Sequence, residues 1–175
     1  MDPIIATGAL APLFQLTDLS GEIYKLEDFQ GRITLLTFWS AECEWCERVD
    51  HELLDWLDSC KETVKVLWIA SNLNESHGLI ERVANTRNLP TVLLDEHQVV
   101  ADLYGAETTP HFFIVERMGK LAYQGAWDDI TFRQRVATRV YVAEAVEALR
   151  QGLTPQVMQT PPYGCILVRY SDSNS

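Results

Sequence analysis

Two cysteines separated by two residues, Cys43 and Cys46, stand where an apolar segment gives way to an amphipathic one. The preceding run, Ile33 to Trp39, is rich in β-branched and aromatic residues, which is typical of a strand buried on both faces. After the pair, apolar residues recur at spacings of three and four. This spacing predicts an amphipathic helix with a stripe of Cys46, Val49, Leu53, Leu57 and Cys60. The chain therefore carries a CxxC motif where a buried strand meets a helix, with Ser40 available as the helix cap.

The position of the motif favours thiol redox chemistry. Free N–H groups and the dipole of a helix N-terminus stabilise an anion, so Cys43 is expected to ionise near neutral pH. Cys46 follows one turn later on the apolar stripe, shielded from outside thiols but close enough to form a disulfide. Acidic neighbours oppose the dipole, and we expect them to be exposed, with Arg48 as the only near countercharge. These acidic residues are Glu42, Glu44, Glu47 and Asp50.

The composition is that of an ordinary globular chain. Of its 175 residues, 47% are hydrophobic and 22% are charged, which predicts a single domain with a substantial core. A net charge of -11 argues against a nucleic-acid partner or an anionic membrane surface, since either would repel the protein. No apolar run is long enough to span a membrane. Residues 1–13 lack the pattern of a signal peptide, so a cytoplasmic location is expected, unless an export segment has been removed. We also expect a monomer.

The order of the predicted elements indicates an α/β fold. Two strand-like pieces, within residues 8–16 and 22–26, flank a turn and predict a hairpin. Further strands are predicted at 33–39, 64–70, 90–95, 111–115 and 121–124, and the helices after the CxxC helix at 76–85, 99–104 and 130–150. The last helix would be capped by Asp128 or Asp129 and would bury Phe132, Val136, Val140, Ala143 and Val146. Strands that alternate with helices and end in a hairpin predict a mixed central sheet flanked by helices.

Residues 8–150 resemble the redoxin, or TlpA-type, branch of the thioredoxin-like superfamily. The resemblance is carried by Gly8 with Ala11-Pro12-Leu13-Phe14-Gln15-Leu16, by the Phe38-Trp39 and Cys43-Glu44-Trp45-Cys46 segment, by Thr109-Pro110, and by the Met118-Gly119-Lys120 turn. It implies a thioredoxin-like fold and a thiol–disulfide oxidoreductase in which Cys43 attacks and Cys46 resolves. It also implies that Pro110 is cis and that the Thr109 backbone pairs with a substrate polypeptide. Without the resemblance a trans bond would be expected, because only about 5–6% of X-Pro bonds are cis.

The surroundings of the motif and its chemistry suggest the remaining site residues and partners. Trp39 and Trp45 are candidate substrate contacts, and Trp45, between the cysteines, is expected to be exposed. The substrate would be a protein or small-molecule disulfide, with a thiol as reductant and with no metal or organic cofactor. Thr37 stands where thioredoxin has a buried acid, so either water or an acid such as Glu47 would have to accept the proton, or thiol transfer would be slower. Of the histidines, only His111, beside Pro110, has a claim to lie near the site.

Two other functions remain open. A thiol peroxidase, related to the peroxiredoxins, would place a proline and a threonine or serine seven and three residues before its reactive cysteine. Counting back from Cys43 gives Leu36 and Ser40, and counting back from Cys46 gives Trp39 and Cys43, so the proline is absent. A non-enzymatic module that binds a metal or a partner through the same thiols is the other alternative. Zinc would require two more ligands at a workable spacing.

The C-terminal segment departs from this pattern. We predict a thioredoxin-like domain over residues 1–150 and a C-terminal extension over 151–175 that packs on the same domain. Residues 151–164 contain three prolines and form an extended linker, followed by the apolar run Cys165 to Val168. Fourteen residues reach roughly 45 Å when extended, so both a sheet edge and the CxxC lie within range. We expect the run to pack along an edge away from Cys43, although Cys165 is a possible accessory thiol.

Overall fold

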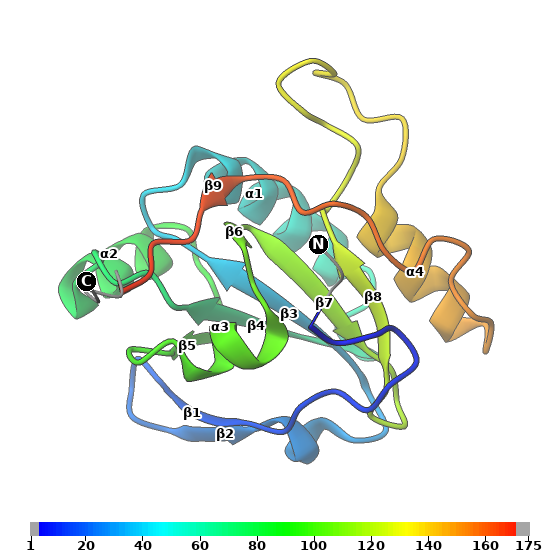
Figure 1. Cartoon of the computed structure of the whole chain (residues 1–175), viewed down its shortest axis with the longest axis horizontal. Coiled ribbons are helices and arrows are strands. Elements are labelled where there is room, and N and C mark those ends of the chain that lie inside the picture. The colour runs from blue at the N-terminus through cyan, green and yellow to red at the C-terminus, as the bar shows by residue number, and fades with distance from the viewer. Residues whose placement is uncertain (1–3, 171–175) are drawn as a thin grey trace, which may run out of the picture.

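The computed structural model of the protein describes residues 4–170, so the outermost residues of both predicted segments, 1–3 and 171–175, lie outside it. The described chain is an α/β structure built around a mixed sheet (Figure 1). Its strands are β1 (Gln15–Asp18), β2 (Ile23–Lys25), β3 (Ile33–Trp39), β4 (Val64–Ala70), β5 (Val92–Leu94), β6 (Thr108–Thr109), β7 (His111–Val115), β8 (Leu121–Gly125) and β9 (Cys165–Ile166). Its helices are the short 3-10 helix η1 (Leu26–Phe29), α1 (Glu44–Asp58), α2 (His77–Thr86), α3 (Val99–Tyr104) and α4 (Tyr141–Arg150).

Seven strands form the main sheet, in the order β2-β1-β5-β4-β3-β7-β8. The central strand β3 pairs in parallel with β4 on one edge and antiparallel with β7 on the other. All seven of its residues are buried, which explains why its sequence is apolar along almost its whole length. Because β3 ends at Trp39, it brings the CxxC motif to the carboxyl edge of the sheet.

Helices cover both faces of the sheet. One apolar cluster joins Ile33 and Leu35 of β3 to helices α1, α2 and α4. The opposite cluster joins Leu36 and Phe38 to α3 and to the N-terminal segment. This division follows from the period of two along a strand, which turns successive side chains toward opposite faces.

Most predicted elements are confirmed. The strands at 33–39, 64–70 and 111–115 have the predicted bounds, and so does the helix at 99–104. The helix predicted at 76–85 is α2, shifted by one residue. Its N-cap Ser76 accepts a hydrogen bond from the Leu79 N–H at 3.2 Å. The N-terminal hairpin is formed by β1 and β2, which pair antiparallel.

The helix predicted for residues 130–150 is wrong over its first half, because α4 begins only at Tyr141. The preceding residues form a loop that projects from the body (yellow in Figure 1). The predicted inner-face residues Phe132 and Val136 are 72% and 76% exposed. Apolar spacing indicates a helix here, but these side chains do not pack on the body, and the segment lacks the buried face that stabilises an amphipathic helix.

The predicted helix caps have other roles. The carboxylate of Asp129 accepts hydrogen bonds from the backbone N–H groups of Thr138 and Arg139, at 2.9 and 3.2 Å, and so closes the loop. Asp128 is buried and pairs with Arg48. The N-cap residue of α4 is Val140, which has no capping side chain, so the prediction of an aspartate cap is wrong.

Candidate active site

Cys43 and Cys46 lie at the start of α1, as the sequence predicts. Cys43 is the N-cap residue, with an extended backbone, and it precedes the free N–H groups of the first turn. Cys46 lies inside that turn, is 1% exposed, and is not disulfide-bonded. Burial raises the pKa of the Cys46 thiol, and the nearby charge of Asp50 adds to this rise. The helix terminus therefore favours a thiolate at Cys43, whereas burial disfavours one at Cys46.

The turn that leads into α1 is held by Glu75, from the loop between β4 and α2. Its carboxylate accepts hydrogen bonds from the Ser40 hydroxyl and from the N–H groups of Ala41 and Glu42, the latter two at 3.1 and 3.2 Å. The prediction of Ser40 as the helix cap is wrong, because Cys43 occupies that position. No local pattern in the sequence connects Glu75 with this turn, which it meets only because β3 and β4 pair in parallel.

Asp50 is a buried acid close to the CxxC motif. Its carboxylate accepts hydrogen bonds from the indole N–H groups of Trp39 and Trp68, at 2.8 and 3.0 Å. The guanidinium of Arg87 donates to it at 3.0 Å. Burial raises the pKa of Asp50, while these three donors oppose the rise. The prediction that Asp50 belongs to an exposed acidic collar is therefore wrong, since it is 3% exposed.

The countercharge near the motif is also a different residue from the one predicted. Arg87 lies beside Asp50, contacts Glu47 at 3.9 Å, and donates to the Ala41 carbonyl at 3.0 Å. Arg48 turns away from this group toward Asp128. The prediction of Arg48 as the only near countercharge is therefore wrong. The sequence could not reveal Arg87, because it comes from the end of α2.

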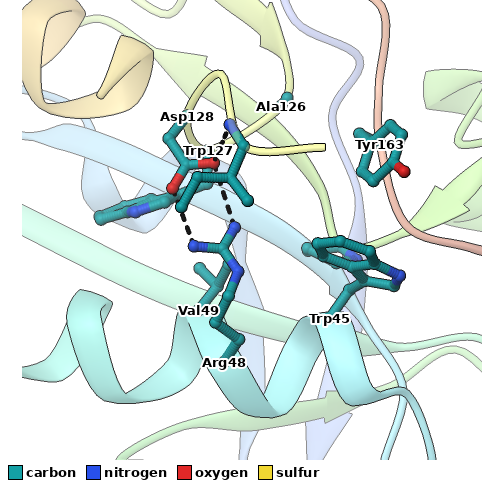
Figure 2. Close-up of a pocket in the computed structure, with 9 residues that line it drawn as sticks. Trp45, Arg48, Val49, Ala126, Trp127, Asp128 and Tyr163 are labelled. Atoms are coloured by element: carbon teal, nitrogen blue, oxygen red, sulfur yellow. Dashed lines mark hydrogen bonds and ion pairs between the residues drawn. The ribbon is translucent and has the colours of Figure 1, made fainter. Parts of the chain in front are cut away.

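A small pocket lies beside the motif (Figure 2). Arg48 and Asp128 form a two-pronged ion pair at its rim, with N–O distances of 2.8 and 3.1 Å. Trp45 lies next to Arg48 and packs edge-to-face against Tyr163, with ring centroids 4.9 Å apart. Trp45 is half-buried, so the prediction that it is exposed is only partly correct. Pro110 lines the same pocket.

The Thr109-Pro110 peptide bond is cis, which confirms the conformation implied by the resemblance. The Cys43 Sγ atom lies 3.0 Å from the Thr109 carbonyl oxygen, so the proline loop and the motif are in direct contact. Thr109 is fully buried. The structure thus brings the two cysteines of the motif together with Thr109 and Pro110, which follow more than sixty residues later in the sequence.

Two other residues considered near the site are buried. Trp39 is 1% exposed and its indole faces Asp50, so it presents no surface to a substrate. His111 is 4% exposed, and its Nδ1 atom accepts a hydrogen bond from the Glu107 N–H at 3.2 Å. Burial lowers the pKa of His111 to about 3, so it is neutral at physiological pH.

Cys165 lies at the active site, contrary to the prediction. It forms a disulfide with Cys43, and their Cα atoms are 6.2 Å apart. Strand β9 pairs antiparallel with β6, and this pairing sets Cys165 opposite Thr109. The apolar run does pack on the body, but it pairs with the short strand β6 beside Pro110 and not with an edge strand of the main sheet. The sequence could not reveal this pairing, because β6 is only two residues long.

No group of three or more His, Cys, Asp or Glu side chains within residues 4–170 is arranged to hold a metal ion. No helix in that part of the chain is long and apolar enough to cross a membrane.

Comparison with known proteins agrees with this geometry. A CxxC motif at a helix start, next to a cis-proline on a thioredoxin-like sheet, is the site of a thiol–disulfide oxidoreductase. The chain belongs to the AhpC/TSA family, which it matches over residues 7–124. It is 30% identical over 118 residues to the thiol-disulfide oxidoreductase ResA of Geobacillus thermodenitrificans, covering 67% of each chain.

Two solved structures extend the comparison. A crystal structure of an uncharacterised conserved protein from Geobacillus kaustophilus superimposes with a TM-score of 0.88 at 29% identity, covering 99% of this chain and 97% of the other. This likeness continues through the segment beyond residue 124. A secreted disulfide oxidoreductase of Mycobacterium tuberculosis, described as homologous to DsbE of E. coli, matches with a TM-score of 0.56 at 25% identity. It covers 62% of this chain and 79% of the other.

The predicted cytoplasmic location is contradicted by these comparisons. A relative with the same fold and activity class is described as secreted. The expectation depended on the composition of residues 1–13, and the relationship to an exported oxidoreductase outweighs it.

Proposed function

We propose that Cys43 is the attacking thiol and Cys46 the resolving thiol of this thiol–disulfide oxidoreductase. The observation that carries the assignment is an asymmetry between the two cysteines. Cys43, at the N-cap of α1, is joined to another segment of the chain through a disulfide, while Cys46 is free and buried behind it. A sulfur that can bond to an incoming segment has the position that an attacking thiol requires.

The reaction then has two steps. The Cys43 thiolate attacks one sulfur of a substrate disulfide, forming a mixed disulfide and releasing the other substrate sulfur as a thiolate. Cys46, as its thiolate, attacks the Cys43 sulfur, releases the second substrate thiolate and leaves a Cys43–Cys46 disulfide. The substrate gains two electrons, and each cysteine gives up one. The same steps in reverse oxidise a substrate dithiol.

Asp50 is the proton acceptor that we assign to Cys46. It lies four residues after Cys46 on the buried face of α1, and its charge acts on the Cys46 thiol. Burial raises the pKa of Asp50, and a more basic carboxylate is a better acceptor for a thiol proton. Asp50 on α1 would thereby take the role of the buried acid that thioredoxin has on the strand, at the position of Thr37.

The substrate side of the site is formed by Thr109, Pro110 and Trp45. Thr109 offers backbone groups to an extended segment, and Trp45 and Pro110 line the adjoining pocket. We propose that the substrate is a protein or small-molecule disulfide and that a thiol reductant restores the reduced enzyme. We also propose that the enzyme is a monomer. The net charge of -11 supports the exclusion of nucleic acids and of anionic membranes as partners.

The peroxidase alternative finds no support at the site. Ser40 would have to orient the peroxide for Cys43, but its hydroxyl is bonded to the buried Glu75 carboxylate. The decisive test is turnover with each substrate class. We expect reduced protein to reduce insulin disulfides, with loss of activity in Cys43→Ser, and to consume hydrogen peroxide no faster than free cysteine. Rapid peroxide turnover without disulfide turnover would overturn the proposal.

A further inference from the structure

The chain's last segment occupies the place where a substrate polypeptide would bind. We call residues 160–169 the C-terminal strap (red-orange in Figure 1). Within it, β9 adds to the edge of β6, with Thr109 opposite Cys165 and Thr108 opposite Ile166. Adding an extended segment to an exposed strand edge is a general mode of peptide recognition. The strap is therefore bound as a peptide, with its cysteine against the attacking thiol.

The fit of the strap depends on a glycine directly before Cys165. A Cβ atom added to Gly164 would collide with the Thr109 carbonyl group and press on the Pro110 ring. Any other residue would therefore push the strap away from the proline loop. The close approach of these two backbones sets the Cys165 sulfur at Cys43.

The strap is held on both sides of Cys165 by contacts that do not involve the disulfide. Before it, the Thr160 hydroxyl accepts a hydrogen bond from the Ala126 N–H at 2.9 Å. After it, Leu167 is 3% exposed within the core, and its N–H donates to the Glu107 carbonyl at 3.0 Å. The disulfide is therefore not needed to seat the strap.

Between these anchors the strap is attached by Tyr163, which packs on Trp45 and accepts a hydrogen bond from the Phe132 N–H at 2.7 Å, and by a short strand pairing around Cys165. The β6–β9 ladder spans two residues on each strand, and Ile166 is 82% exposed. Opening this short ladder uncovers Cys43, which is otherwise only 3% exposed, while Thr160 and Leu167 keep both ends in place. A thiol that leaves and returns over such a short distance has a high effective concentration at its target.

We propose that Cys165 is a third catalytic thiol, which resolves mixed disulfides on Cys43 when the strap closes over the site. The proposal rests on the function given above, because it needs Cys43 as the attacking thiol. The Cys43–Cys165 disulfide is then an oxidised state of the enzyme, and the strap competes with polypeptides for the Thr109 edge.

The step balances as an ordinary thiol–disulfide exchange. A substrate disulfide first forms a mixed disulfide with Cys43. The Cys165 thiolate attacks the Cys43 sulfur, forming the Cys43–Cys165 bond and breaking the bond to the substrate, which leaves as a thiolate and takes up a proton. In total, one substrate disulfide is reduced to two thiols while Cys43 and Cys165 are oxidised. Cys46 can then attack Cys43, transferring the disulfide to the CxxC pair and freeing the Cys165 thiol.

Exposure explains why Cys165 would act before Cys46. Cys46 lies beneath Cys43, and burial raises the pKa of its thiol. Cys165 is only partly buried, and its Cα atom lies 6.2 Å from that of Cys43. The thiolate that exchange requires is more easily formed on the less buried sulfur.

The test uses full-length chains that carry Cys60→Ala, so that Cys43, Cys46 and Cys165 are the only thiols. Each reduced variant is mixed with cystamine, and the species that form are followed by intact-mass spectrometry. With Cys46→Ser we expect a cysteamine adduct to form on Cys43. The adduct should then be lost as the Cys43–Cys165 disulfide forms. With Cys46→Ser and Cys165→Ser together we expect the adduct on Cys43 to persist. Cys46→Ala repeats the first measurement in case serine disturbs the fold.

A second pair of variants tests the seating of the strap. In the Cys46→Ser background, Gly164→Ala should slow the loss of the adduct by about tenfold, because overpacking displaces the strap. Gly78→Ala is the matched control, since a Cβ at Gly78 has no neighbour within 4 Å, and it should leave the rate unchanged.

The outcomes separate the two proposals. A persistent adduct in both Cys46→Ser and Cys46→Ala would overturn the role of Cys165 and leave Cys43 as the attacking thiol. Equal rates for Gly164→Ala and Gly78→Ala would overturn the part of the proposal in which closure of the strap against Thr109 delivers Cys165 to Cys43. Failure of the Cys46→Ser, Cys165→Ser variant to form any adduct would instead overturn the proposed function itself.

Discussion

The indole N–H of Trp39 donates a 2.8 Å hydrogen bond to the carboxylate of Asp50, and both side chains are buried. Trp39 ends the central strand directly before the motif, and Asp50 lies on α1 directly after it. The bond therefore ties the strand that leads into the motif to the helix that follows it. It also fixes a carboxylate within electrostatic reach of Cys46.

The first prediction concerns proton transfer by Asp50. In a Cys165→Ser background, Asp50→Asn should slow resolution by Cys46 about a hundredfold, because asparagine cannot accept the proton. Formation of the Cys43 adduct should change little. Stopped-flow mixing with cystamine, with mass analysis of quenched samples, separates the two steps.

The pH dependence of the same step gives a second reading of Asp50. The carboxylate must be ionised to accept a proton, so resolution should slow as the pH falls through the Asp50 pKa. Burial raises this pKa, so the slowing should begin above the ordinary range of an aspartate. Asp50→Asn should abolish this limb of the profile. An identical limb in that variant would assign the titration to another group.

His111 should make the fold sensitive to acid. Its pKa is lowered from 6.5 to about 3 by burial, so the unfolded state binds the proton more readily between these pH values. Stability is therefore fully present above about pH 6.5 and is lost as the pH falls, by up to about 1.4 kcal/mol per pH unit. The free energy of unfolding, measured with urea, should fall more steeply with decreasing pH in wild type than in His111→Asn over this window. Parallel curves would contradict this reading of His111.

The seating of the strap can be measured through two adjacent residues. Leu167 is 3% exposed in the core and Ile166 is 82% exposed. Leu167→Ala should lower the free energy of unfolding by about 2–4 kcal/mol, because it leaves a cavity. Ile166→Ala should change it by less than about 0.5 kcal/mol. Chemical denaturation under reducing conditions measures both, and equal effects would mean that the strap is not anchored in the core.

The ion pair between Arg48 and Asp128 should stabilise the pocket rim. The Asp128 side chain is 1% exposed, so Arg48→Met leaves a buried carboxylate without its partner and should cost about 3 kcal/mol. Lys61→Met is the matched control, because Lys61 is 63% exposed and pairs with Asp58 only at 3.9 Å. Thermal unfolding should separate the two variants clearly, and comparable shifts would contradict the importance of the Arg48 pair.

The centre of the fold could be predicted from the sequence because its signals are local. The apolar run of β3, the CxxC motif and the stripe of α1 lie within one continuous segment, in which β3 is buried along its whole length and α1 buries one face. The cis bond at Pro110 came from the family resemblance. Asp50 could have been recognised as buried, because it lies on the same helical face as Cys46 and Leu53.

The rest of the site depends on long-range placement. Glu75 and Arg87 reach the motif from a loop and from the end of α2, and no periodicity reports such contacts. The sequence predicts that Cys165 lies along a sheet edge away from Cys43, because the two-residue strand β6 is too short to be recognised from a sequence pattern. In the projecting loop a local pattern was misleading. Phe132 and Val136 have helical spacing, but both side chains are exposed and the segment is not a helix.

Limited alkylation distinguishes an attacking Cys43 from an attacking Cys46 within the CxxC pair. The reduced chain is treated with substoichiometric iodoacetamide, and modified peptides are quantified by mass spectrometry. Cys43 should be modified well before Cys46, because the helix terminus favours its thiolate and burial disfavours that of Cys46. Labelling of Cys46 as fast as that of Cys43 would show that Cys43 is not the attacking thiol.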